Sequence, residues 1–153
     1  METTETQSGN LMTFAAINNH PYNIVLLLHL FSVILGTGAA FLVPALQVKY
    51  KKLGQSPEVA LQSFADIMSP SLLLGGVFGG ALVGMSDDVY DFGQTWLAIG
   101  GALWILAVIS AGLVFPPSFV NLPDLSIKKS ILSGILHLAL AGMLVLMVWK
   151  PGY

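Results

Sequence analysis

Three heterocyclic aromatic side chains stand well inside apolar stretches of the sequence, away from their ends, namely His29, Trp104 and His137. A neutral imidazole is the commonest metal ligand in proteins, and a buried indole N–H requires an acceptor. His29 stands three residues before Ser32, His137 stands four residues after Ser133, and Trp104 follows a glycine by four residues. Because residues three or four apart share a helical face, we expect all three heterocycles to point into a bundle of helices.

Two interpretations of these side chains remain open. In the first, each neutral histidine hydrogen-bonds to a backbone carbonyl, a serine or another polar side chain, at about 0.6 kcal/mol per contact between helices. In the second, His29 and His137 ligate the iron of haem b or bind a quinone headgroup, with Trp104 beside them. At a rise of about 1.5 Å per residue, the two histidines differ in membrane depth by roughly 8 Å. Both could be axial ligands of one haem only if helix tilt reduced this difference.

Methionine is a soft ligand that could add a copper ion to this list of candidates. Met143 and Met147 follow His137 by six and ten residues. They therefore point about 80 to 120° away from it around a helix. We expect these methionines to contact lipid or to fill the packing between helices.

The sequence contains four long apolar stretches, at about residues 22–46, 64–85, 92–115 and 131–149, and three of them contain the heterocycles. Each can cover the hydrocarbon core of a bilayer, which takes about 20 helical residues. Continuous runs such as IVLLLHLFSVIL lack the alternation of barrel strands. We therefore predict an all-α membrane protein whose single domain, residues 1–153, is an up-and-down bundle of four transmembrane helices in contact with the lipid bilayer.

Prolines and caps predict where the helices begin, end and bend. Pro21 suits the first turn of the first span, and Pro44 removes the hydrogen bond to the Ala40 carbonyl and should bend that span. Pro70 either kinks one long helix or separates a surface helix from the second span. Asp91, with a glutamine three residues later, resembles a capping box opening the third span. Residues 11–17 form either an interfacial helix or an irregular tail.

Composition and charge indicate the cellular environment of the protein and its orientation. Of the 153 residues, 55% are hydrophobic and 9% are charged, whereas a soluble domain has about 25% charged residues. Arginine and cysteine are absent and the net charge is -2, which leaves no basic patch for nucleic acid and no thiolate metal site. Five of the six lysines fall between spans 1 and 2 or between spans 3 and 4. The positive-inside rule then predicts a multi-pass protein of a bacterial-type cytoplasmic membrane with both termini outside.

The run LLLHLFSVILGTGAAFLVPAL, with its early histidine and small-residue stripe, resembles the first helix of a group of small bacterial membrane proteins. The group includes the copper-resistance D family, the HemJ-type protoporphyrinogen oxidases and a related family of predicted integral membrane proteins of unknown function, to which the chain is most similar. The resemblance implies that His29 matches the first-helix histidine, which is a haem ligand in the HemJ type. The arginine-rich context of HemJ-type proteins is missing.

These patterns lead to three hypotheses about function. No acid-base pair or activated nucleophile is recognisable, which favours a non-catalytic accessory or structural subunit that packs against other membrane subunits or against copies of itself. Small residues at four-residue spacing, such as Gly76, Gly80 and Gly84, supply faces for such packing. The alternative is a haem b or quinone-binding redox protein that uses His29 and His137. A metal or small-solute permease is the third hypothesis.

Overall fold

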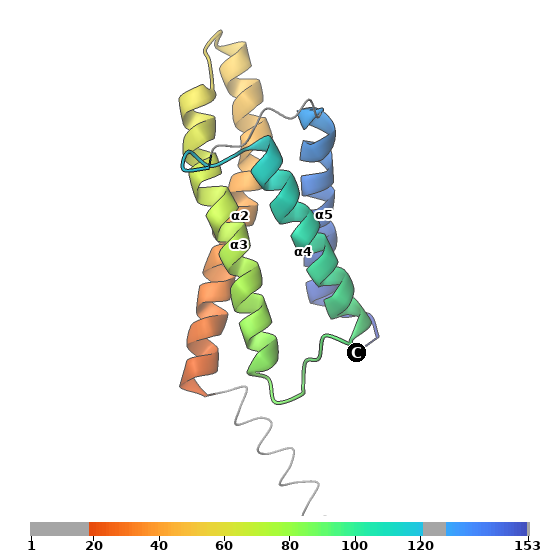
Figure 1. Ribbon diagram of the computed structural model, residues 1–153. Coiled ribbons are helices and arrows are strands. Elements are labelled where there is room, and N and C mark those ends of the chain that lie inside the picture. Colours follow the sequence, from red (N-terminus) through yellow and green to blue (C-terminus); the bar gives the residue numbers. More distant parts are fainter. Residues whose placement is uncertain (1–18, 121–127, 153) are drawn as a thin grey trace, which may run out of the picture.

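The computed structural model describes residues 19–120 and 128–152, which form four long helices in an up-and-down arrangement (Figure 1). All four are long and apolar enough to cross a membrane, which confirms the prediction of an all-α, four-span protein. The predicted segment 11–17 lies outside the described residues. The helices are α2 (His20–Lys52), α3 (Glu58–Gly84), α4 (Thr95–Val114) and α5 (Lys129–Trp149).

Helix α2 begins where Pro21 predicts it, and a side-chain cap precedes it. The Asn19 side chain accepts a hydrogen bond from the Tyr22 backbone N–H at 2.9 Å, and Pro21 occupies the first turn, where its missing N–H leaves no donor unpaired. The last turn carries three lysines, which is the favourable charge for the negative end of a helix dipole. Gly54 then reverses the chain with a φ of 65°, a conformation that suits glycine.

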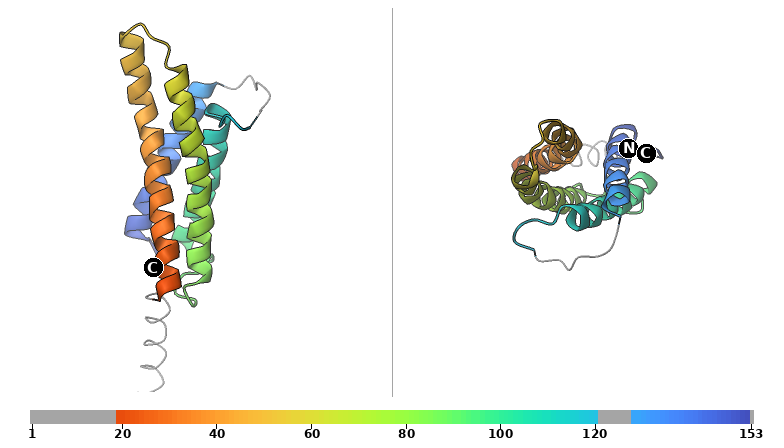
Figure 2. Two further views of the ribbon diagram at one scale, coloured as in Figure 1. Left: turned by 90° about the vertical axis from the view of Figure 1, so that its left-hand side faces the viewer. Right: turned by 90° about the horizontal axis from the view of Figure 1, so that it is seen from above.

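Both internal prolines lie within continuous helices. Pro44 is inside α2, and Pro70 is inside α3, which runs unbroken from Glu58 to Gly84. Of the two alternatives for Pro70, the single long helix is therefore the one observed. The helical hairpin formed by α2 and α3 extends beyond the adjoining ends of α4 and α5 (Figures 1 and 2).

The third span begins later than its predicted capping box. Helix α4 starts at Thr95, and its N-cap residue, Gln94, makes no capping bond with its side chain. The Asp91 carboxylate accepts instead from the Gly93 N–H at 2.6 Å, in a local turn of the kind that aspartate side chains favour over helix. The capping box at Asp91 was thus a wrong prediction, because the same carboxylate instead closes a local turn with the N–H two residues later.

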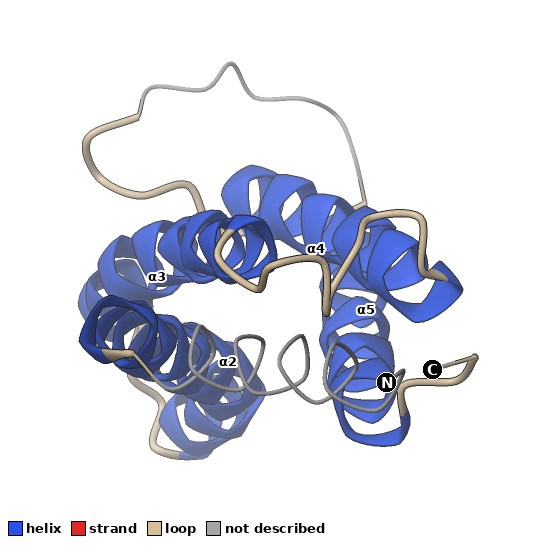
Figure 3. Cartoon of the chain, turned by 90° about the horizontal axis from the view of Figure 1, so that it is seen from below, coloured by secondary structure: helices blue, strands red, loops and turns tan. Residues whose placement is uncertain are grey.

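The helices associate as two pairs, with α2 along α3 and α4 along α5 (Figures 2 and 3). At Gly36 of α2, an added Cβ would lie 2.9 Å from the Leu72 side chain and 3.0 Å from its backbone nitrogen, so only glycine lets α3 approach this closely. The predicted small-residue stripe of the first span, which includes Ser32 and Ala40, is buried accordingly.

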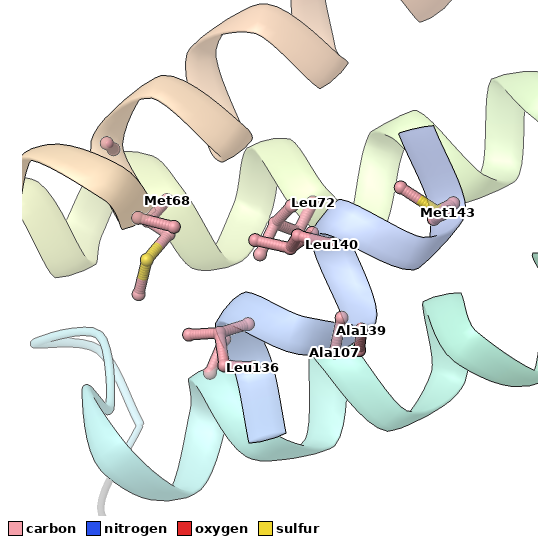
Figure 4. Close-up of a cluster of buried hydrophobic side chains, with 10 residues drawn as sticks. Met68, Leu72, Ala107, Leu136, Ala139, Leu140 and Met143 are labelled. Carbon is pink, nitrogen blue, oxygen red and sulfur yellow. The ribbon is translucent and has the colours of Figure 1, made fainter. Parts of the chain in front are cut away.

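All four helices contribute to one buried apolar cluster (Figure 4). Met143 is 7% exposed and belongs to this cluster, so it packs between helices, whereas Met147 is 38% exposed on the outer surface. The cluster consists of Ala39, Ala40, Met68, Leu72, Ala107, Ala111, Leu136, Ala139, Leu140 and Met143.

Candidate functional site

His29 joins α2 to α3 through a backbone carbonyl. Its Nδ1 lies 2.8 Å from the Gly75 carbonyl oxygen, and the ring is half-buried. Because a carbonyl only accepts, a hydrogen bond here requires the proton on Nδ1 and leaves Nε2 of the neutral ring with a lone pair. Gly79 provides the space, since an added Cβ there would come within 3.1 Å of the imidazole Cε1. The ring therefore faces the neighbouring helix, as the sequence indicated.

Trp104 joins α4 to the same stretch of α3. Its indole N–H donates to the Leu72 carbonyl oxygen at 2.8 Å, which supplies the acceptor that a buried indole needs. A Cβ on Gly76 would lie 1.8 Å from the indole Cε2, so the ring occupies the place that a side chain would take. The small-residue row of α3 thus receives the indole of Trp104 from α4 at Gly76 and the imidazole of His29 from α2 at Gly79.

His137 joins α5 to α2 at a carbonyl that lacks its helical partner. The imidazole Nε2 lies 3.1 Å from the Ala40 carbonyl oxygen, and the ring packs edge-on against Phe41 with centroids 5.2 Å apart. Ala40 stands four residues before Pro44, which has no N–H to donate back to it. The sequence indicated both the freed carbonyl and the inward histidine, and the structure brings the two together.

The other nitrogen of His137 also faces an oxygen. Nδ1 lies 2.5 Å from the Ser133 carbonyl oxygen, one turn earlier in α5. Each tautomer of the neutral ring can donate to one of the two carbonyls, and only the imidazolium can donate to both. Ser133 lies in the regular part of α5, where its carbonyl has a helical partner, so the Ala40 carbonyl is the one that depends on the imidazole.

The two histidines do not meet. His137 reaches α2 at Ala40, eleven residues after His29, which corresponds to roughly 16 Å along the helix at about 1.5 Å per residue. Two axial ligands of one iron must approach the same atom, so this arrangement does not place His29 and His137 on a single haem. Within residues 19–120 and 128–152, no group of three histidine, aspartate or glutamate side chains could hold a metal ion.

A further polar cluster ties α3 to the segment after α4. Asp66 Oδ1 accepts from the Ser118 backbone N–H at 2.6 Å, and Oδ2 accepts from the Ser118 hydroxyl at 3.1 Å. The Gln62 amide donates to Asp66 Oδ1 at 3.1 Å and to the Pro116 carbonyl at 3.2 Å. The sequence did not indicate these partners of Asp66, because nothing local to Asp66 shows which distant loop lies beside it.

The opposite end of the bundle holds a cation among aromatic rings. Lys150 Nζ donates to the Tyr90 hydroxyl at 3.1 Å and lies 4.8 Å from the Tyr90 ring centroid and 5.6 Å from that of Trp96. The two rings meet edge to face, with centroids 5.9 Å apart. Tyrosine and tryptophan rings are enriched where membrane proteins meet the membrane–water interface, and the lysine adds cation–π attraction that links the end of α5 to the start of α4.

Comparison with models of protein families, with curated proteins and with solved structures finds no match to this chain. No family is therefore assigned, and the resemblance of the first helix to the copper-resistance D and HemJ-type group has no further support. The four apolar helices define an integral, multi-pass membrane protein in contact with the lipid bilayer.

Proposed function

We propose that the protein is a non-catalytic structural or accessory subunit of a membrane complex. The observation that carries this proposal is the use of the three intramembrane heterocycles. His29 and Trp104 each make a hydrogen bond to a backbone carbonyl of an adjacent helix, and His137 lies within hydrogen-bond distance of another. Such contacts stabilise the association of helices in lipid. In these contacts, the polar groups of the three side chains serve to hold the helices together.

A face of α3 offers a place for a partner helix. Gly80 and Gly84 stand four residues apart, and no described atom lies within 4 Å of a Cβ added to either. Their row continues from Gly76, whose space is filled by Trp104 within the chain. Small residues at this spacing let two backbones approach closely in a bilayer. We propose that this outer part of the row contacts another membrane subunit or a second copy of the chain.

Leucine substitutions test this proposal. The double variant Gly80→Leu/Gly84→Leu should lose a partner that co-purifies after gentle detergent extraction, or should lose the self-association of the purified protein. Gly38→Leu is the matched control, because Gly38 also has open space at its Cβ among the described residues but is flanked at four residues by Ile34 and Leu42. A wild-type protein that is strictly monomeric and free of partners would count against the accessory role.

A haem b or quinone-binding redox protein is the second candidate, and one observation favours it for His29 alone. Nδ1 of this ring is held by the Gly75 carbonyl, which leaves the Nε2 lone pair as an acceptor or ligand. The visible spectrum of protein expressed with haem available is the test. This candidate predicts a Soret band that disappears in His29→Ala and persists in His137→Ala, and a colourless protein would rule out haem.

We also propose that the basic end of the bundle faces the cytoplasm of a bacterial-type cell. Lys49, Lys51 and Lys52 end α2, and Lys128 and Lys129 begin α5, so all five lie at the same end of the structure (Figure 1). The positive-inside rule supports this orientation. The chain has no cysteine, so single cysteines can be labelled selectively. A membrane-impermeant maleimide applied to whole cells should label cysteine at Gly152 and spare cysteine at Gly54.

A further inference from the structure

A cavity of about 320 Å³ opens at the basic end of the bundle, between α2, α4 and α5. Its volume is at the lower end of the range of small-molecule sites, about 300 to 1,000 Å³. The residues that line it are Gln47, Val114, Phe115, Lys129, Ser130 and Ser133.

The polar part of this lining suits an oxyanion. Lys129 has an ammonium group, Gln47 an amide, and Ser130 and Ser133 a hydroxyl each, so two helices contribute residues with hydrogen-bond donors to the lining. Among the residues that the structure describes, the lining contains no carboxylate. Charge-assisted bonds to several oxygens of one group favour a phosphate. The cavity therefore has the donors and the charge for a phosphate monoester or diester.

The position of the cavity indicates where that phosphate comes from. Phe115 directly follows the last residue of α4, and Lys129 is the first residue of α5. The cavity therefore lies at the ends of two membrane spans, where they meet the membrane–water interface. Val114 and Phe115 give it an apolar wall. Basic pockets between transmembrane helices on the cytoplasmic side, where we propose that this end of the bundle lies, bind the headgroups of anionic lipids.

We propose that this cavity binds a phosphate group, supplied by the headgroup of an anionic phospholipid. The proposal is independent of the accessory role, because it concerns another face and another chemistry. It predicts that phosphatidylglycerol binds more tightly than phosphatidylcholine. Lys129 should account for about a fivefold difference in affinity, since one lysine near an anionic surface contributes about 1 kcal/mol.

The experiment titrates each lipid into the delipidated, detergent-solubilised full chain and counts bound lipids by native mass spectrometry. Lys129→Gln should weaken phosphatidylglycerol binding about fivefold, and Ser133→Ala should weaken it less. Lys51→Gln is the matched control, because Lys51 is an exposed lysine of the same end that does not line the cavity. Circular dichroism of each variant in the same detergent confirms that the helices are intact.

A second titration, with inorganic phosphate, identifies whether the bound phosphate group comes from a lipid headgroup or from free phosphate. Displacement of phosphatidylglycerol only by other anionic lipids supports the lipid headgroup. Binding of millimolar inorganic phosphate that Lys129→Gln abolishes, without any preference for phosphatidylglycerol, keeps the phosphate site but overturns the lipid source. Equal losses in Lys129→Gln and Lys51→Gln, or no binding of either probe, would overturn the site itself.

Discussion

The contact between His137 and the Ala40 carbonyl makes a quantitative prediction, because Pro44 is the reason that this carbonyl needs a donor. His137→Phe removes the imidazole nitrogens and keeps an aromatic ring beside Phe41. In the wild-type background, this substitution leaves the Ala40 carbonyl without a partner in the apolar interior. In a Pro44→Ala background, the restored backbone N–H of residue 44 can satisfy the same carbonyl. The cost of His137→Phe should therefore depend on residue 44.

The expected magnitude follows from the energetics of hydrogen bonds between helices in lipid. Such bonds contribute about 0.6 kcal/mol on average and up to about 1.7 kcal/mol, and a buried group left without a partner costs about 1 to 3 kcal/mol. We expect His137→Phe to lower the free energy of unfolding by about 1.5 kcal/mol in the wild-type background. In Pro44→Ala, the loss should be about 0.5 kcal/mol, which leaves a coupling of about 1 kcal/mol.

The assay is reversible unfolding in mixed micelles of SDS and a mild detergent, followed by circular dichroism, for the four proteins of the double-mutant cycle. Pro70→Ala is the matched control, because it also removes a proline from a helix interior, but the N–H that it restores faces the carbonyl of Asp66, which His137 does not contact. The coupling between His137→Phe and Pro70→Ala should be close to zero. A coupling of zero with Pro44→Ala as well would refute the reasoning and would assign the imidazole proton to Nδ1, facing Ser133.

Three other substitutions probe the polar groups and glycines of the bundle. Ser110→Ala should leave the free energy of unfolding unchanged or raise it by up to about 1 kcal/mol, because the buried Ser110 hydroxyl has no hydrogen-bond partner in the part of the chain that the structure describes. Ser86→Ala should lower it by about 1 to 2 kcal/mol, since the Ser86 hydroxyl donates to the Val83 carbonyl and accepts from the Tyr90 backbone N–H. Equal effects of the two serine substitutions in SDS titrations would contradict at least one of these expectations. Gly76→Ala should displace the indole of Trp104, with a loss of about 2 kcal/mol or more and a shifted tryptophan emission maximum, and an unchanged emission spectrum would show that the ring lies elsewhere.

The spans and their inward faces could be predicted because they depend on local spacing. Continuous apolar runs fix the four helices, and small residues at three- or four-residue intervals indicate where His29 and Trp104 point. The freed carbonyl of Ala40 follows from Pro44 alone. The partner of that carbonyl did not follow, because His137 is 97 residues away and the pairing of helices is a property of the whole bundle. Asp91 misled the prediction of the third span because its carboxylate suits a turn as well as a cap.

The distribution of polar contacts between the helices gives a physical reason for their presence in so apolar a chain. The α2–α3 and α4–α5 pairs have the extensive packing, whereas α3 meets α4, and α2 meets α5, through far fewer residues. Trp104 bonds across the α3–α4 boundary, and His137 contacts α2 across the α2–α5 boundary. Lipid competes with apolar side chains for helix surfaces but cannot offer a donor to a backbone carbonyl. Trp104 and His137 therefore lie where packing alone is weakest, as expected if they join two helix pairs into one bundle, whereas His29 makes its contact within the α2–α3 pair.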